Sequence, residues 1–459
     1  MTERLVVIGG DAGGMTAASQ ARKRRGRDEL EIVAFERGHY TSYSACGIPY
    51  VLGGVVDELQ DLVVRSPEVF RDRFDIDVHT GYEVTEIDLD KRAVQVRNGD
   101  GDQIWEGFDH LVIATGGTPR RFDWPGSDAR GIFGVQTLDD AVAIEKYLSD
   151  ETPKNAVIVG GGYIGLEMAE ALVNRGLTVA LVEAAPQPMN ALDPDMGAVI
   201  ADALKAMGVE VHLTRPVDGF ESTSGRVSGV VTDDGVVPAD IVVLGLGTRP
   251  NSELAEASGV PIGPSKGIKV DRRMETEIKG VWAAGDCAEK FHLVSRAPVA
   301  IALGTHANKE GRVAGINIAG GYATFPGVLG TAVSKVCGYE VARTGLREQD
   351  ARTAGFRHLT ATVDSTTRAG YYPDAAPIKT KLIVERRSGR LLGGQIIGKE
   401  GAAKRIDTVA TALWNEMTVD EMIHLDLGYA PPFSPLWDPV LVAARKAWDK
   451  VQATASDLR

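Results

Sequence analysis

Three cysteines, Cys46, Cys287 and Cys337, are the side chains of this sequence whose chemistry is easiest to define. Cys46 lies in the segment SYSACGIPY, residues 42–50, and a valine follows it, so no second cysteine stands five positions on. A lone thiol can form a mixed disulfide with a small thiol, or it can be oxidised to a sulfenic acid. A free cysteine is otherwise a small apolar residue of the core, and we interpret Cys287 and Cys337 in this way.

A glycine-rich turn, GGGYIG at residues 160–165, has the composition of a dinucleotide-binding turn. Gly160 permits a tight turn, Gly162 lets the backbone approach a pyrophosphate, and Gly165 allows the following helix to pack closely on the strand. Glu183 follows at the distance expected of a carboxylate that binds ribose hydroxyls. The four features together predict a dinucleotide site.

A second turn, GGDAGG at residues 9–14, departs from this pattern because Asp11 replaces the middle glycine. The flanking glycines still permit a close approach of the backbone, and Glu36 occupies the position equivalent to Glu183. A carboxylate beside a pyrophosphate would be repelled, so we expect Asp11 to point away from it. This turn is either a nucleotide site or a structural glycine turn.

Both turns require a strand before them and a helix after them, and short apolar runs supply both elements. Two other expected strands end in small-residue turns, ATG at 114–116 and AGD at 284–286. The chain beyond about residue 325 alternates strand and helix patterns and predicts a separate α+β domain. The expected strands are 5–8, 31–35, 156–159, 178–182, 381–384 and 395–397, and the expected helices are 15–25, 166–174, 405–414 and 419–424.

Composition limits the class of protein. The chain has 459 residues and a net charge of −13, which disfavours nucleic acid as a partner. It contains no CxxC pair, so we expect no metal site, and no apolar run of 18 residues, so we expect no membrane span. Few cysteines and no leader pattern predict a cytoplasmic enzyme.

The residues after Glu183 bear on the choice between the two nicotinamide cofactors. The sequence AAPQP at 184–188 contains no Arg or Lys that would pair with a 2′-phosphate. A carboxylate alone binds a free ribose diol and repels the phosphate, so NADH is favoured over NADPH.

The turns and the segment TEIKGVWAAGD, residues 276–286, together resemble the flavoprotein disulfide reductases with two dinucleotide-binding domains. The resemblance implies an α/β fold of two Rossmann-like domains and an α+β C-terminal dimerisation domain. It implies FAD in the first unit, with Asp286 on the ribityl chain, and NAD(P)H in the second. The implied bounds are 1–120 with 250–322 for FAD, 121–249 for NAD(P)H, and 323–459 for dimerisation.

The setting of Cys46 is similar to the single-cysteine branch of that family. This branch contains coenzyme A disulfide reductases, persulfide or polysulfide reductases, NADH oxidases and NADH peroxidases. The blocks FPGVLGT at 325–331, GKEGAAKRID at 398–407 and YAPPFS at 429–434 also resemble the branch. The resemblance implies a redox role for Cys46 and a homodimer in which Tyr371 and Tyr429 reach the partner's cysteine. Alternatively, both tyrosines only pack in the interface.

Position 12 discriminates between activities of the branch. The peroxidases and many oxidases carry a histidine there, and this sequence has Ala12. We therefore expect an FAD-dependent NADH oxidoreductase that reduces a small disulfide or persulfide, such as coenzyme A disulfide, through Cys46. The alternative is an NADH oxidase or peroxidase that uses a Cys46 sulfenic acid. A non-catalytic electron carrier or NADH sensor finds no support. No rhodanese-like domain is expected after residue 459.

Coenzyme A is a further candidate ligand, and its phosphates require a basic patch. The resemblance and the local charge indicate Thr16, Gln20, Lys23, Arg65 and Arg73, although each cation could equally belong to a solvated face. Arg22 and Arg71 are weaker candidates. The branch often has a cation shortly after its YAPP block, but residues 434–437 carry none, so the thiol carrier could differ. The residues expected to bind the cofactors are Gly9, Gly10, Ala12, Gly13, Gly14, Glu36, Arg37, Ser42, Ala114, Thr115, Gly116, Gly160, Gly162, Tyr163, Ile164, Gly165, Glu167, Glu183, Gly247, Gly285, Asp286 and Ala302.

Overall fold

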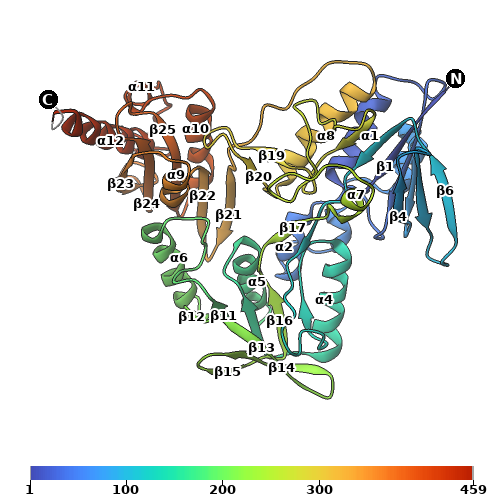
Figure 1. Ribbon diagram of the computed structural model, residues 1–459. Coiled ribbons are helices and arrows are strands. Elements are labelled where there is room, and N and C mark those ends of the chain that lie inside the picture. The colour runs from blue at the N-terminus through green and yellow to red at the C-terminus, as the bar shows by residue number, and fades with distance from the viewer. Residues whose placement is uncertain (1, 457–459) are drawn as a thin grey trace.

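A computed structural model describes residues 2–456 and contains three sheets of five strands (Figure 1). Two of the sheets are parallel and the third is antiparallel. Two smaller antiparallel sheets of three strands each flank the parallel ones. The alternation of apolar strands and helices in the sequence accounts for the two parallel sheets, because βαβ connections bury both faces of such a sheet.

The first sheet has the order β18-β7-β1-β2-β3, so strands from distant parts of the chain lie side by side. Helix α8 packs against α1 because Gly311 and Gly315 leave no side chain between them. A Cβ added at either glycine would lie 2.3 Å from a carbonyl oxygen of α1. The elements of this region are β1 Glu3–Ile8, α1 Ala12–Arg22, β2 Leu30–Glu36, β3 Asp77–Thr80, β7 His110–Ile113, α7 Glu253–Ala257, β18 Val281–Ala283 and α8 Gly304–Ile318.

Helix α1 begins earlier and ends earlier than the predicted 15–25. It begins at Ala12, because the glycines of the turn already adopt helical geometry. It ends at Arg22, because the amides of Arg24 and Arg25 both bond to the Ala21 carbonyl and close the last turn.

Between β2 and β7 the chain forms the Cys46 segment and one of the small sheets. Glycine and proline positions break this stretch into short elements. They are the 3-10 turns Ala45–Gly47 and Leu59–Leu62, the helices α2 Ile48–Leu52 and α3 Pro67–Phe74, and the strands β4 Glu83–Asp88, β5 Ala93–Arg97 and β6 Gln103–Gly107.

The second sheet has the order β12-β11-β10-β16-β9. The chain leaves the first sheet at β8 and returns at β17, and these two short strands pair antiparallel. The elements are β8 Gly117–Pro119, β9 Ile132–Phe133, α4 Leu138–Glu151, β10 Asn155–Val159, α5 Tyr163–Asn174, β11 Thr178–Glu183, α6 Pro194–Ala206, β12 Glu210–Leu213, β13 Val217–Thr223, β14 Arg226–Thr232, β15 Gly235–Pro238, β16 Ile241–Leu244 and β17 Thr248–Pro250.

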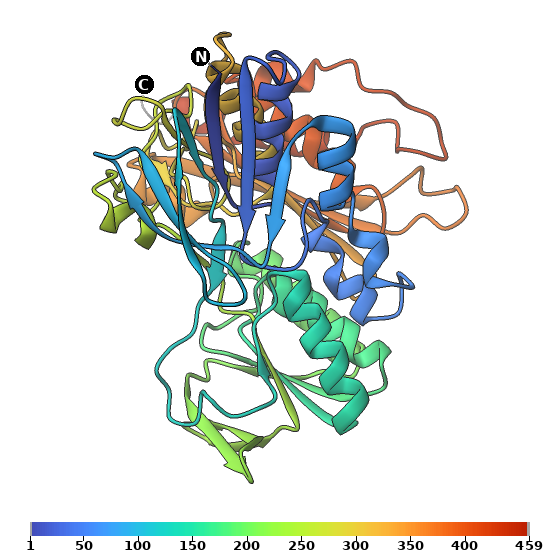
Figure 2. The ribbon, with the colours of Figure 1, turned by 90° about the vertical axis from the view of Figure 1, so that its right-hand side faces the viewer.

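The C-terminal sheet has the order β21-β22-β25-β24-β23 and is covered by α10 and α12. Figure 2 shows the loops 367–376 and 424–438 extending from this region, on the right of the view. Within residues 2–456, no helix is long and apolar enough to cross a membrane. The elements are β19 Lys290–Phe291, β20 Pro298–Val299, β21 Ala332–Val336, β22 Tyr339–Gly345, α9 Glu348–Thr353, β23 His358–Thr366, β24 Pro377–Glu385, β25 Leu391–Gly398, α10 Ala402–Trp414, α11 Val419–Ile423 and α12 Pro439–Ser456.

Candidate functional site

The first glycine turn, residues 9–14, closes tightly between β1 and α1. Gly9 has a φ of +107°, and an added Cβ there would lie 2.1 Å from the Ala114 carbonyl oxygen. An added Cβ at Gly14 would lie 2.1 Å from the Gly9 carbonyl oxygen. Asp11 stands at the N-cap of α1, but its side chain makes no capping hydrogen bond. The amides of the first helical turn are therefore available to an anionic group.

Asp11 contacts the Cys46 segment. Its carboxylate accepts a hydrogen bond of 3.2 Å from the amide N–H of Tyr43. Burial raises the pKa of Asp11 to about 6, and the charges of Glu36 and Asp286 add to this effect. The side chain thus connects the glycine turn with the segment that carries Cys46.

Glu36 ends β2 beside a cavity of about 280 Å³. Its carboxylate accepts hydrogen bonds of 2.7 Å from the amides of Gly10 and Gly38. Arg37, whose side chain is exposed, also lines this cavity, together with residues 117–119. A carboxylate, a guanidinium and backbone amides around such a volume fit the adenosine end of a dinucleotide.

The second turn, residues 160–165, repeats the geometry of the first. Gly160 has a φ of +97°. An added Cβ at Gly165 would lie 2.1 Å from the Gly160 carbonyl oxygen. Gly162 is the N-cap of α5 and provides no capping side chain. Glu183 accepts hydrogen bonds of 2.7 and 2.8 Å from the amides of Gly161 and Ala185. This turn therefore also leaves helix amides available to phosphates.

Tyr163 and Glu167 lie on the first turns of α5, facing the C-terminal region. The Tyr163 hydroxyl is buried and has no hydrogen-bond partner in the described residues. Glu167 accepts a hydrogen bond of 2.7 Å from Ser334 of β21, and burial raises the pKa of its carboxyl. Ile164, between them, is half-buried. An unpaired buried hydroxyl is a polar group that a ligand could satisfy, and it fits a nicotinamide pocket.

Asp286 follows β18, and a buried ion pair supports its turn. Burial raises the pKa of Asp286, and the amide of Leu303, before α8, donates to its carboxylate. Beneath this turn, Lys290 donates to the Gly285 carbonyl at 2.8 Å and lies 3.4 Å from Glu310. Glu310 in turn accepts a 2.8 Å hydrogen bond from the Gly285 amide. This pair was not predicted from the sequence, because only the packing of α8 brings Glu310 beneath the turn.

Other residues predicted to bind the cofactors lie near β8 and β17, where the chain crosses between the two parallel sheets. The Thr115 hydroxyl donates to the Asn251 carbonyl at 2.5 Å, and the Asn251 amide donates to the Gly116 carbonyl at 3.0 Å. Gly247 has a φ of +78° directly before β17, and Ala302 is exposed before α8. Asn251 was not among the predicted residues.

Cys46 lies exposed on a 3-10 turn, followed by α2. The structure brings it near carboxylates from both parallel sheets. Partial burial of its sulfur raises the pKa of Cys46, and the charges of Glu167, Asp286 and Asp11 raise it further. The chain thus favours the protonated thiol. A nucleophilic thiolate needs a positive charge or a hydrogen-bond donor from a ligand or a second subunit. Ser42 begins this segment in the left-handed region, with a φ of +48°.

Tyr371 belongs to loop 367–376 and Tyr429 to loop 424–438, the two loops that extend from the C-terminal region (Figure 2). Both are exposed, and a hydrogen bond with Tyr429 raises the pKa of Tyr371. Within residues 2–456, no hydrogen bond joins either tyrosine to Cys46 of the same chain. Large apolar side chains are also exposed on the same loops, namely Tyr372, Phe433, Leu436 and Trp437.

The predicted substrate residues divide into two groups. Thr16 and Gln20 have partners within the protein, since Thr16 donates to Asn308 at 2.8 Å and Gln20 accepts from Arg24 at 2.9 Å. The side chains of Lys23, Arg65 and Arg73 are exposed. Of the weaker candidates, Arg22 donates to the Leu30 and Asp75 carbonyls, and Arg71 donates to the Val78 carbonyl.

The other two cysteines lie in different surroundings from Cys46. Cys287 is fully buried, and its thiol donates to the Ile113 carbonyl at 3.4 Å. Burial, together with Glu170, raises the pKa of Cys337 to about 12. Neither environment favours a thiolate. Among the described residues, no cluster of His, Cys, Asp or Glu could hold a metal ion.

Comparisons with known proteins agree with this architecture. Residues 3–311 match the pyridine nucleotide-disulphide oxidoreductase family, and residues 331–439 match its dimerisation domain. An NAD(P)H sulfur oxidoreductase (CoA-dependent) of Pyrococcus abyssi is 41% identical over 442 residues, covering 96% of this chain and 97% of that protein. An NADH oxidase of Methanocaldococcus jannaschii is 35% identical, covering 98% and 99% of the two chains.

A solved structure is similar throughout. The NAD-dependent persulfide reductase from A. fulgidus has a TM-score of 0.95 and 39% identity, with 98% of this chain and 84% of that chain covered. The matches over both segments, together with the two glycine turns and the C-terminal sheet, show that this chain belongs to the pyridine nucleotide-disulphide oxidoreductase family.

Proposed function

We propose that the protein is an FAD-dependent NADH oxidoreductase that reduces a small disulfide or persulfide through Cys46. The observation that carries the proposal is the position of the Cys46 segment, which contacts both nucleotide units. The Tyr43 amide donates to Asp11 of the first unit at 3.2 Å, and Arg175 of the second unit donates to the Leu52 carbonyl at 2.6 Å. A mixed disulfide formed at Cys46 would lie next to both nucleotide units and could accept the electrons that pass from one to the other. When bound, FAD and NADH supply two-electron transfer from the nicotinamide.

The first unit would hold FAD. The 9–14 turn and the uncapped start of α1 would bind the pyrophosphate, Glu36 the adenosine ribose, and Asp286 the ribityl hydroxyls. The turn at 114–116 and the start of α8 near Ala302 would complete the enclosure. The expected bounds, 1–120 with 250–322, 121–249 and 323–459, remain our proposal for the three domains.

The second unit would bind NADH in preference to NADPH. Glu183 is 9% exposed and accepts hydrogen bonds from two amides, and its carboxylate would repel a 2′-phosphate. Arg215 lies beside Glu183 along the backbone, because its amide donates to the Glu183 main-chain carbonyl at 3.0 Å. Its guanidinium, however, pairs with Asp233 at 3.2 Å and Asp234 at 2.6 Å. The two aspartates compete with a 2′-phosphate for this arginine.

A disulfide substrate would react with Cys46 by thiol–disulfide exchange. The Cys46 thiolate attacks one sulfur, the substrate S–S bond breaks, and one thiol leaves after taking a proton. Cys46 is then held in a mixed disulfide with the other half. Two electrons and a proton cleave this bond, restore the Cys46 thiolate and release the second thiol. A persulfide would release hydrogen sulfide in the same way.

A second subunit would complete the site. Tyr371 and Tyr429 are exposed on the extended loops, among apolar side chains that a homodimer would bury. A phenol from the partner could protonate the leaving thiolate. Lys23, Arg65 and Arg73 would attract a phosphorylated carrier such as coenzyme A. We also propose a cytoplasmic location, since the three cysteines are free thiols.

The second candidate function is an NADH oxidase, the activity for which the Methanocaldococcus jannaschii relative is named. In that case Cys46 would alternate between thiol and sulfenic acid, and oxygen or peroxide would accept the electrons. Ala12 provides no imidazole for that chemistry. An anaerobic acceptor panel with coenzyme A disulfide, a persulfide and polysulfide, compared with oxygen and peroxide, separates the two.

The central test is Cys46→Ser in the holoenzyme. We expect sulfur-acceptor turnover to fall by at least about 10³-fold, because the nucleophile is lost. FAD content and anaerobic flavin reduction by NADH should stay at wild-type levels. Cys337→Ser is the matched control, and it should retain turnover, since Cys337 has a pKa of about 12. Retained sulfur turnover in Cys46→Ser would refute the proposal.

A further inference from the structure

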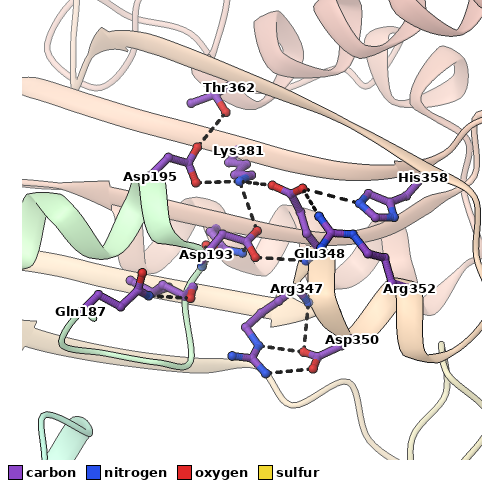
Figure 3. Close-up of polar contacts among 12 residues, drawn as sticks. Gln187, Asp193, Asp195, Arg347, Glu348, Asp350, Arg352, His358, Thr362 and Lys381 are labelled. Atoms are coloured by element: carbon purple, nitrogen blue, oxygen red, sulfur yellow. Dashed lines mark hydrogen bonds and ion pairs between the residues drawn. The ribbon is translucent and has the colours of Figure 1, made fainter. Parts of the chain in front are cut away.

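Lys381 of β24 is buried in contact with carboxylates that begin α6 (Figure 3). It is 2% exposed, and its Nζ lies 3.2 Å from Asp193 and 2.6 Å from Asp195. The same Nζ lies 2.6 Å from Glu348, which begins α9. Removal of a buried cation from such a group leaves carboxylates without compensation. The C-terminal sheet is thus fixed to the second unit at this point.

Gln395 of β25 fixes Asp193 further. Its side-chain N–H donates to the Asp193 carboxylate at 2.7 Å, and its carbonyl oxygen accepts the Asp193 amide at 2.9 Å. The Glu348 amide donates to the other Asp193 oxygen at 3.1 Å. Gln395 and Asp193 are 1% and 3% exposed. We refer to Asp193, Asp195, Glu348, Lys381 and Gln395 together as the clasp.

The clasp holds the end of the loop that follows Glu183. Loop 184–192 runs from Glu183, at the end of β11, to Asp193. Midway, the Met189 amide donates to the Gly161 carbonyl at 2.6 Å, so the loop packs on the second glycine turn. Met189 adopts the left-handed region, with a φ of +52°, which requires support from its surroundings. The loop therefore contacts the nucleotide turn at Met189, and it contacts the C-terminal region through Arg347, which donates to the Asn190 carbonyl, and through Asp193.

We propose that the clasp positions loop 184–192, and with it Glu183, for binding the adenosine half of the nicotinamide nucleotide. The inference rests on the proposed function of the second unit. Lys381 and Gln395 are positioning residues, which act through Asp193 and the loop. Affinity for the nucleotide therefore depends on the C-terminal region, although the nucleotide motif lies wholly in the second unit.

The test compares Lys381→Met with Lys379→Met in the FAD-loaded enzyme. Lys379 lies on the same face of β24, two residues away, is 30% exposed in its side chain, and faces Asp364 at 3.7 Å. Calorimetric titration measures binding of ADP-ribose, which contains the adenosine, the pyrophosphate and the second ribose of NAD but no nicotinamide. Steady-state kinetics separates KM for NADH from kcat. Gln395→Leu is a second variant that removes both hydrogen bonds without burying a new charge imbalance at Lys381.

Lys381→Met and Gln395→Leu should each raise the Kd for ADP-ribose about tenfold, the scale of a lost hydrogen bond to a charged group. KM for NADH should rise in parallel, whereas kcat and flavin content should not change. Reduced nicotinamide mononucleotide, which lacks adenosine, should reduce the flavin at the wild-type rate. Lys379→Met should match the wild type, and Lys381→Arg should regain most of the affinity.

An unchanged Kd for ADP-ribose in a folded variant would overturn the inference and leave the clasp a purely structural contact. If Lys381→Met does not fold, Gln395→Leu decides the question by the same measurement. If the wild-type enzyme bound neither ADP-ribose nor NADH, the proposed role of the second unit would be refuted, and the inference with it.

Discussion

The two glycine turns have the same local geometry but different surroundings. In both turns, the carboxylate that ends the following strand accepts a hydrogen bond of 2.7 Å from an amide of the turn. Glu36 accepts it from Gly10, and Glu183 accepts it from Gly161. Both helices begin without a capping side chain. The first turn carries Asp11, which contacts the Cys46 segment. The second turn is instead packed against a loop that ends in the clasp.

The difference indicates that a dinucleotide-binding turn is specialised by what packs against it. The first turn is enclosed by β7, the Asp286 turn and α8, an arrangement suited to a ligand that stays bound. The second is bounded by loop 184–192 and the C-terminal sheet, an arrangement suited to a ligand that exchanges.

The largest effect is expected from Gly14→Ala compared with Gly165→Ala. In both variants the added methyl would lie 2.1 Å from a carbonyl oxygen, so the turn must open. The strain costs more than about 3 kcal/mol. We expect Gly14→Ala to yield protein without FAD or unfolded protein, and Gly165→Ala to retain FAD but lose reduction by NADH. Flavin absorbance per chain and anaerobic stopped-flow reduction measure the two outcomes. Full flavin content in Gly14→Ala would contradict the assignment of the first unit.

If Tyr429 of one subunit serves the Cys46 site of the other, Tyr429→Phe should lower sulfur-acceptor turnover by about 10²-fold, the scale of a lost acid catalyst. The rate of flavin reduction by NADH should not change, because NADH would bind to the second unit of the same chain. Heterodimers of Cys46→Ser and Tyr429→Phe chains should regain activity, because half of their sites combine Cys46 with Tyr429. Verified heterodimers that regain nothing would place Tyr429 outside the partner's site.

Removal of the carboxylate in the second unit should alter coenzyme preference. The wild-type enzyme should use NADH with higher kcat/KM than NADPH, and Glu183→Ala should reduce that ratio by about tenfold, about 1.4 kcal/mol. The cause is loss of ribose hydrogen bonds and of repulsion toward the 2′-phosphate. Steady-state kinetics with both coenzymes provides the measurement. Equal or better efficiency of the wild-type enzyme with NADPH would contradict the charge argument at Glu183.

The smallest effect concerns Asp11, which has no counterpart in the second unit. Its pKa is raised from 3.8 to about 6, so the folded state holds this proton more tightly than the unfolded state. Stability from this group is present below about pH 4 and is lost as pH rises toward 6. Asp11→Asn should match the wild type at pH 4 and raise the free energy of unfolding by about 1 kcal/mol at pH 8. Denaturant unfolding at both pH values measures the difference, and an equal change at both would contradict it.

Much of the nucleotide-binding architecture could be predicted from the sequence. The strands before and after each turn lie within one or two residues of expectation, because apolar runs, glycines and an acidic residue in fixed order are local signals. The C-terminal antiparallel sheet and its helices were expected only in outline. Three contacts were not predicted: the Lys290–Glu310 pair, the hydrogen bonds of Asn251 with residues 115–116, and the Arg215–Glu183 backbone contact. Each of them joins residues that are at least 20 positions apart in the chain.

The sequence by itself determined the two nucleotide units, the lone Cys46 and the acidic residues that end β2 and β11. These depend on side-chain type and short spacing, and backbone geometry follows from them directly. Only the tertiary structure decided that Asp11 faces Tyr43, that Glu167 and Asp286 lie near one thiol, and that Lys381 meets Asp193. Such contacts depend on how loops and whole sheets pack together, and no local pattern records the relative position of segments that are distant in the chain.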